Sequence, residues 1–92
     1  MIQNNRTQSE KIEFRFHAPD AKSVGVAGSF NGWDPTQTPL RRRFGGDWRA
    51  ALKLTPGRHE YRFVADGKWF TDPGADETGP NPYGGCNSVR VV

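Results

Sequence analysis

The chain has 92 residues, of which 34% are hydrophobic and 12% aromatic, and a formal net charge of +3. This length fits one small domain and excludes a catalytic (β/α)8 barrel, which needs roughly 250 residues. The single cysteine, Cys86, excludes a disulfide within the chain, and no apolar run approaches the ~18 residues of a membrane-spanning helix.

The first residues of the chain are polar. Residues 1–9 contain no apolar stretch of the kind found in a signal peptide. We therefore expect a flexible N-terminal segment over residues 1–9, one folded module over residues 10–92, and a cytoplasmic location.

The rest of the chain consists of short runs in which apolar and polar residues alternate. Ile12, Phe14 and Phe16 alternate with charged residues in the first run, which is typical of a half-buried strand. In chain order, strands are expected over residues 11–18, 22–28, 40–44, 48–54, 59–65, 68–71 and 87–92. A loop rich in glycine, proline and aspartate is expected over residues 72–85. Because no window shows a helical period, the pattern predicts an all-β sandwich of about seven short strands.

The dipeptide Asp66-Gly67 predicts a two-residue hairpin turn, which fixes how the flanking strands pair. The expected pairs are Ala65 with Lys68, Val64 with Trp69, Phe63 with Phe70, and Arg62 with Thr71. Side chains alternate between the two faces of a strand, so one face carries the more apolar set and is predicted to be core. This set comprises Tyr61, Phe63, Ala65 and Phe70. Trp69 is then predicted to stand on the outer face, diagonally next to Arg62.

The three tryptophans have different predicted environments. Trp48 leads an alternating strand and is expected in the core. Trp33 follows the turn-forming Asn31-Gly32 and is either a binding platform or a cap on one end of the sandwich. Trp69 stands beside a cation and is either a binding platform or a side chain covered by the loop over residues 72–85. An exposed indole can stack on a base, a cation or the apolar face of a sugar. For a sugar, Arg62, Asn31 and Asn87 are available to bond with hydroxyls.

Catalysis and metal binding have less support in the sequence. The carboxylates that could form an acid–base pair lie in turns, where aspartate is common for conformational reasons: Asp66, Asp72, Asp76 and Glu77. His17, His59 and Cys86 lack the spacing of metal ligands. We expect no catalytic residue, no metal and no cofactor.

Three segments agree, in order and in spacing, with one known family. They are VGVAGSFNGWDP from Val24, PGRHEYRFVADGKWFTDP from Pro56 and NPYGGCNSVRVV from Asn81. In these segments the chain resembles the family-48 carbohydrate-binding module, which includes the glycogen-binding domain of the AMP-activated protein kinase beta subunit and the N-terminal domain of isoamylases and glycogen branching enzymes. The resemblance covers residues 10–92. It implies an early-set, immunoglobulin-like antiparallel β-sandwich that binds α-1,4-linked glucans such as glycogen, starch and maltooligosaccharides.

The resemblance also assigns glucan contacts to six positions: Trp33, Trp69, Arg62, Asn87, Tyr83 and Gly85. It implies that the two tryptophans stack on glucose units and that Arg62 and Asn87 bond to hydroxyls. Arg62 stands where kinase-type members have a lysine, and its planar guanidinium has a different geometry. Tyr83 replaces a leucine and Gly85 replaces a threonine, so the contacts at these two positions are expected to differ.

Two other functions stay open from the sequence. Single-stranded nucleic-acid binding could use the same aromatics together with the basic run Arg41 to Arg43. Alternatively, the sandwich could be a protein-interaction module that docks on a glycogen-metabolising enzyme or a kinase. The favoured partner is an α-glucan, with neither nucleic acid nor a membrane expected.

Overall fold

The computed structural model describes residues 9–92, which contain eight β-strands and no helix. The strands are β1 (Glu10–His17), β2 (Val24–Gly28), β3 (Arg41–Arg43), β4 (Asp47–Leu54), β5 (Arg58–Ala65), β6 (Lys68–Phe70), β7 (Glu77–Pro80) and β8 (Cys86–Val91). The flexible segment predicted over residues 1–9 lies, except for its last residue, outside the described part of the chain.

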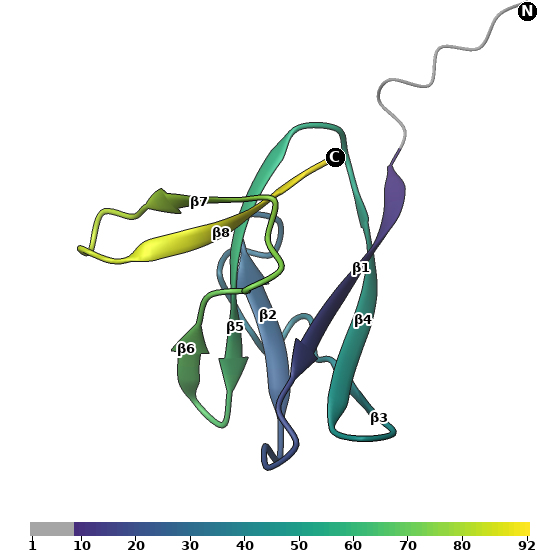
Figure 1. Cartoon of the computed structure of the whole chain (residues 1–92). Coiled ribbons are helices and arrows are strands. Elements are labelled where there is room, and N and C mark those ends of the chain that lie inside the picture. Colours follow the sequence, from purple (N-terminus) through teal and green to yellow (C-terminus); the bar gives the residue numbers. More distant parts are fainter. Residues whose placement is uncertain (1–8) are drawn as a thin grey trace, which may run out of the picture.

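The strands form two antiparallel sheets, one of three strands and one of five (Figure 1). The three-stranded sheet has the order β1-β4-β3, and the five-stranded sheet has the order β2-β5-β8-β7, with β6 paired to β5. The predicted all-β, immunoglobulin-like sandwich is therefore confirmed. In Figure 1 the β7–β8 hairpin projects to one side, beyond the part of the sandwich formed by β2, β5 and β6.

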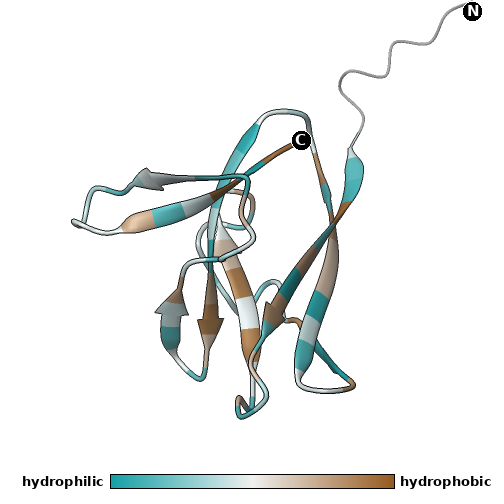
Figure 2. Cartoon of the chain, in the orientation of Figure 1, coloured by the Kyte–Doolittle hydropathy of each residue, from teal (hydrophilic) through white to brown (hydrophobic). Residues whose placement is uncertain are grey.

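Aromatic side chains from both sheets meet in the core. Phe14 of β1 lies edge-on to Tyr61 of β5, with ring centroids 4.9 Å apart. The ring centroids of Phe16 and Phe63 are 4.7 Å apart. β2 and β5, near the centre of Figure 2, carry much of the hydrophobic colour. Trp48 is 6% exposed, and its Nε1 donates a hydrogen bond of 2.9 Å to the Ala18 carbonyl, which confirms the predicted core position.

The β5–β6 hairpin has the register that the Asp66-Gly67 turn predicts for its first three pairs. β6 ends at Phe70, so the fourth predicted pair, Arg62 with Thr71, is not part of the ladder. Phe70 was expected in the core but is 41% exposed, because β6 is a short edge strand and, among the described residues, only the Phe16 ring lies close to it, with ring centroids 5.7 Å apart. Val64 is buried although it points to the outer face of the sheet. It pairs with Gly25, whose missing side chain leaves room for the Pro35 backbone to lie directly against the sheet.

The segment expected as one loop over residues 72–85 contains β7. This strand pairs with β8 from Glu77 opposite Val89 to Pro80 opposite Cys86. Its four residues show no alternation of apolar and polar side chains, and proline is usual only at strand edges and ends, so the sequence pattern could not reveal it.

A buried polar cluster ties the start of this segment to the sandwich. The Tyr61 hydroxyl donates a 2.6 Å hydrogen bond to Asp72 Oδ2, and the Asp72 amide donates to the Ser88 hydroxyl at 2.7 Å. Burial raises the pKa of Tyr61 well above its ordinary value, and the hydrogen bond to Asp72 is the second largest cause. The cluster fixes where the chain leaves β6 and enters the β7–β8 hairpin.

Candidate functional site

An open groove of about 640 Å³ lies on the outer face of the five-stranded sheet. Five of the six predicted site residues line it: Trp33, Arg62, Trp69, Tyr83 and Asn87. The sixth, Gly85, is exposed and lies outside the lining. Five further lining residues were not predicted: Ser29, Arg58, Glu60, Asn81 and Pro82.

Trp69 and Arg62 stand together on this face. Trp69 is 42% exposed, and the guanidinium carbon of Arg62 lies 5.8 Å from the centre of its ring, within cation–π range. Arg62 Nη2 also donates to the Trp69 carbonyl at 3.4 Å. The outward placement of the pair is as predicted, and the arginine helps to fix the orientation of the indole.

Trp33 reaches the groove from a strained turn after β2. Its backbone is left-handed, with φ of 63°, and that of Gly32 is also left-handed, with φ of 67°. The Gly28 carbonyl accepts hydrogen bonds from the amides of Asn31 (3.1 Å) and Trp33 (2.9 Å). In an Asn-Gly hairpin turn, the asparagine and the glycine both have positive φ angles. Here the positive φ angles fall one residue later, on Gly32 and Trp33. A left-handed conformation costs a side-chain-bearing residue roughly 1 kcal/mol or more, and such strain is concentrated at functional sites.

Asn31 does not serve the groove as the sequence suggested. Its Oδ1 accepts from the Gly28 amide at 3.0 Å, and its Nδ2 donates to the Val26 carbonyl and to the Thr38 hydroxyl, both at 2.9 Å. Because its oxygen and nitrogen are both engaged in the protein, Asn31 stabilises the loop that carries Trp33 rather than offering groups to a ligand.

Asn87 belongs to a chain of polar side chains in the groove. It is 6% exposed, its Nδ2 donates to Glu60 Oε1 at 2.9 Å, and its Oδ1 accepts from Asn81 Nδ2 at 3.2 Å. Glu60 could have been found from strand alternation, because it lies two residues before Arg62 on the same face of β5. Asn81 had no such signal, since it lies in a loop.

Asn81 also shapes the loop that carries Tyr83. Its side-chain Oδ1 accepts from the backbone amides of Tyr83 (2.9 Å) and Gly85 (3.1 Å), and its backbone amide donates to the Gly85 carbonyl at 2.8 Å. Tyr83 is 93% exposed at the rim of the groove. Gly85 thus contributes backbone groups to the loop.

The charges around the groove are balanced. Arg58 Nη2 forms an ion pair of 2.8 Å with Glu77 Oε1, which lies next to the groove, and Arg62 stands near Glu60 on the same strand face. Two cations thus face two carboxylates. A charge-balanced groove with one exposed and one half-buried indole, and with planar hydrogen-bonding groups, suits a neutral polar ligand that has an apolar face.

The structure does not bring the basic run to this groove. Arg41 to Arg43 form β3 of the three-stranded sheet and are absent from the groove lining. These arginines therefore do not share one surface with Trp33 and Trp69, as the nucleic-acid site considered from the sequence would require.

The four carboxylates that the sequence placed in turns have structural partners, and one of them, Glu77, begins strand β7. Asp66 accepts from the Lys22 and Ser23 amides, Asp72 from Tyr61 and Gly74, and Asp76 from the Val91 amide, while Glu77 pairs with Arg58. Within residues 9–92, no group of three or more His, Cys, Asp or Glu side chains is arranged to hold a metal ion. This part of the chain also has no helix long and apolar enough to cross a membrane.

Comparison with known proteins identifies one family and several relatives. The family described as the glycogen recognition site of AMP-activated protein kinase matches residues 11–92. A 1,4-alpha-glucan branching enzyme of Xanthomonas campestris pv. campestris is 42% identical over 60 residues, which is 62% of this chain and 8% of the enzyme. The chloroplastic PTST homolog 2 of Arabidopsis thaliana is 42% identical over 53 residues, or 58% of this chain and 10% of that protein. The beta-2 subunit of 5'-AMP-activated protein kinase from Mus musculus is 44% identical over 52 residues, or 56% of this chain and 18% of the subunit. The chain spans less than a fifth of the length of each of these relatives.

Proposed function

Because the chain belongs to the family of the glycogen recognition site of AMP-activated protein kinase, we propose that it binds α-1,4-linked glucans without catalysis. The ligand class comprises glycogen, starch and maltooligosaccharides, and the binding site is the groove on the five-stranded sheet. The binding module comprises residues 10–92.

The observation that carries this proposal is the placement of Trp33 and Trp69 in one groove. The two rings come from a loop after β2 and from β6, and both line the same open surface. Successive glucose units of a curved α-glucan present apolar faces that stack on such rings. The strained backbone of Trp33 fits this role, because the turn would otherwise favour glycine at that position.

Polar groups between the rings supply the hydrogen bonds to sugar hydroxyls. We assign this role to Arg62 and Asn87, and add Glu60, whose carboxylate is held by Asn87. Within the described residues the Arg62 guanidinium makes one hydrogen bond, of 3.4 Å from Nη2 to the Trp69 carbonyl, so its terminal nitrogens retain unused bonding capacity. Tyr83 offers a further stacking face at the rim, and Gly85 adjoins the groove through backbone groups only.

The affinity is expected to be modest. Each hydroxyl bond replaces a bond to water, so we expect a Kd between roughly millimolar and micromolar, which corresponds to about −4 to −8 kcal/mol. Since the groove is charge-balanced and the ligand neutral, salt should change this affinity little.

The proposal is tested by titrating the protein with maltoheptaose and by retention on a glycogen or amylose gel beside a cellulose control. We expect a change in tryptophan fluorescence from Trp33 and Trp69, while buried Trp48 stays unaffected. A matched pair of variants is Trp69→Ala and Phe44→Ala, because Phe44 is also an exposed ring but lies outside the groove. Equal binding by both variants, or no retention of the wild type on either α-glucan gel, would refute the proposal.

The wider setting of the module also belongs to the proposal. The relatives are a branching enzyme, a chloroplastic protein and a kinase subunit, and the chain matches only a small part of each. We propose that the module brings a glycogen-metabolising enzyme or a kinase to its glucan. The cytoplasmic location stays a prediction from the sequence.

A further inference from the structure

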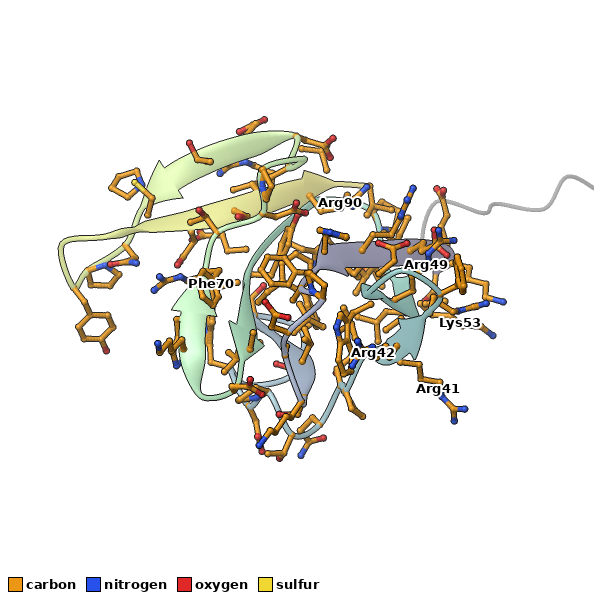
Figure 3. The ribbon with its side chains drawn as sticks, turned by 60° about the horizontal axis from the view of Figure 1, so that its bottom comes forward. Arg41, Arg42, Arg49, Lys53, Phe70 and Arg90 are labelled. Atoms are coloured by element: carbon orange, nitrogen blue, oxygen red, sulfur yellow. The ribbon has the colours of Figure 1, made fainter. Side chains whose placement is uncertain are left out.

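The outer face of the three-stranded sheet concentrates positive charge. Strand alternation turns the apolar residues of β1 and β4 inward and leaves the charged ones outward, and the register aligns two residues of β3 with them. Six cations share this surface, which we call the basic face: Lys11, Arg15, Arg41, Arg43, Arg49 and Lys53. Figure 3 shows Arg41, Arg49 and Lys53 on the side of the molecule away from Phe70 and the β7–β8 hairpin.

Like charges lie directly opposite each other on the basic face. The register pairs Lys11 with Lys53, and it places Arg49 between Arg15 and Arg41. Directly opposed like charges destabilise a sheet, whereas opposite charges would stabilise it. The arrangement therefore lowers the stability of the fold. Such conflicts between local sequence and stability are typical of functional surfaces.

Carboxylates within the face neutralise only part of this charge. Asp47 lies 2.8 Å from Arg49 and 3.6 Å from Arg15, and Glu13 lies 3.9 Å from Arg49. Two of these three contacts involve Arg49. Among residues 9–92, Arg41, Arg43 and Lys53 take part in no ion pair and are exposed.

An apolar side chain adjoins the basic face. Phe44 follows Arg43 at the tip of the β3–β4 hairpin and is 102% exposed, so its ring packs against nothing in the described structure. Gly45 and Gly46 have φ angles of 80° and 78° and close the turn behind it. An unpacked phenylalanine beside several arginines matches the composition of protein interfaces, in which aromatic residues and arginine are enriched.

We propose that the basic face, with Phe44 at its margin, docks an acidic segment of a partner protein. Arginine guanidinium groups pair with carboxylates through two parallel hydrogen bonds, which favours an acidic polypeptide. Among the described residues, Phe44 and the His17 imidazole are the only rings on or beside this face, so it lacks the series of aromatic side chains on which successive bases of a single-stranded nucleic acid stack. Because the groove lies on the other sheet, partner and glucan can bind at the same time.

The site can be mapped with a peptide of glutamates around one central leucine, added to the isotope-labelled chain and followed by amide chemical shifts. We expect shifts in β1, β3 and β4 with this peptide, shifts around the groove with maltoheptaose, and both sets when the two ligands are combined. The double variant Arg41→Gln/Arg43→Gln should weaken peptide binding by about fivefold or more, because it removes two unpaired cations. Its matched control, Lys22→Gln/Lys68→Gln, removes two exposed cations outside the basic face and should change binding by less than about twofold. Phe44→Ala should weaken the peptide and leave maltoheptaose binding unchanged.

Several results would overturn the inference. Equal losses in the two double variants, with dispersed spectra showing that both fold, would show that net charge rather than this face attracts the peptide. Tighter binding of a thymidine oligonucleotide, or of phosphatidylserine vesicles, at the same ionic strength would assign the face to another class of partner. Because maltoheptaose is measured on the same samples, failure of the docking surface is distinguishable from failure of the glucan groove.

Discussion

Replacing Trp69 with alanine tests the glucan groove at its most exposed indole. Trp69 is 42% exposed. Since a tryptophan buries up to roughly 250 Å² when fully covered, about 100 Å² of this side chain remains open to a ligand. If a glucose unit covers half to all of that area, at ~25 cal/mol per Å², the lost contact is worth about 1.3 to 2.5 kcal/mol. The Kd for maltoheptaose should therefore rise roughly 10- to 70-fold in Trp69→Ala.

The affinity is best measured by isothermal titration calorimetry, because the variant lacks one of the fluorescent reporters. The fold should survive, since Trp69 lies on a short edge strand and the Trp69 carbonyl that accepts from Arg62 is a backbone group. Thermal unfolding checks this point, and Phe44→Ala serves as the control for loss of an exposed ring. A loss of less than about twofold in folded Trp69→Ala would refute the assignment of Trp69 as a stacking platform.

Three further predictions concern the loop that carries Trp33, the buried polar cluster and the basic face. Asn31→Ala should lower the free energy of unfolding, measured in urea, by about 2 to 3 kcal/mol, because it leaves the Gly28 amide, the Val26 carbonyl and the Thr38 hydroxyl without this partner. The stability of the wild type should fall as pH rises above about 10, by at most ~1.4 kcal/mol per pH unit, because the unfolded chain releases the Tyr61 proton before the folded chain does. Tyr61→Phe should remove this alkaline loss, and Tyr83→Phe, at an exposed position, should not. Arg41→Glu should raise the free energy of unfolding by about 0.2 to 1 kcal/mol, because it replaces a like charge opposite Arg49, whereas Lys22→Glu should not.

Most of the sandwich could be predicted from alternation and turns because each strand buries one face. β1, β4 and β5 have inward apolar residues at every second position, and Asp66-Gly67 fixes the register of the hairpin. β7 escaped prediction because it is an edge strand held by backbone pairing to β8, so its side chains carry no pattern. Phe70 is exposed because β6 is a short strand at the edge of the sheet, and the alternation of residues does not reveal which strand lies at an edge.

A groove residue could be predicted where the strand that carries it determines which face of the sheet its side chain points to. Trp69 and Arg62 follow from the hairpin register, Trp33 and Asn87 were candidates from the sequence that the resemblance supported, and Tyr83 came from the resemblance alone. The role of Asn31 could not be predicted, because its partners Val26 and Thr38 approach it only when the loop closes over β2. Asn81 was missed for a related reason, since its importance lies in its bond to Asn87, whereas Glu60 could have been found from its place two residues before Arg62 on β5.

The distribution of charge makes the two outer faces respond differently to salt. On the five-stranded sheet, the cations near the groove have carboxylate neighbours, as in the Arg58–Glu77 pair, so added salt has little net charge to screen. On the basic face, six cations stand against Glu13 and Asp47, and screening acts on both the repulsion between them and the attraction of an acidic partner. Raising the ionic strength should therefore stabilise the three-stranded sheet while weakening the acidic peptide, and it should leave maltoheptaose binding nearly constant. Two surfaces that share one core but respond differently to salt can be loaded and released independently, and this property would let the module hold a glucan while it exchanges protein partners.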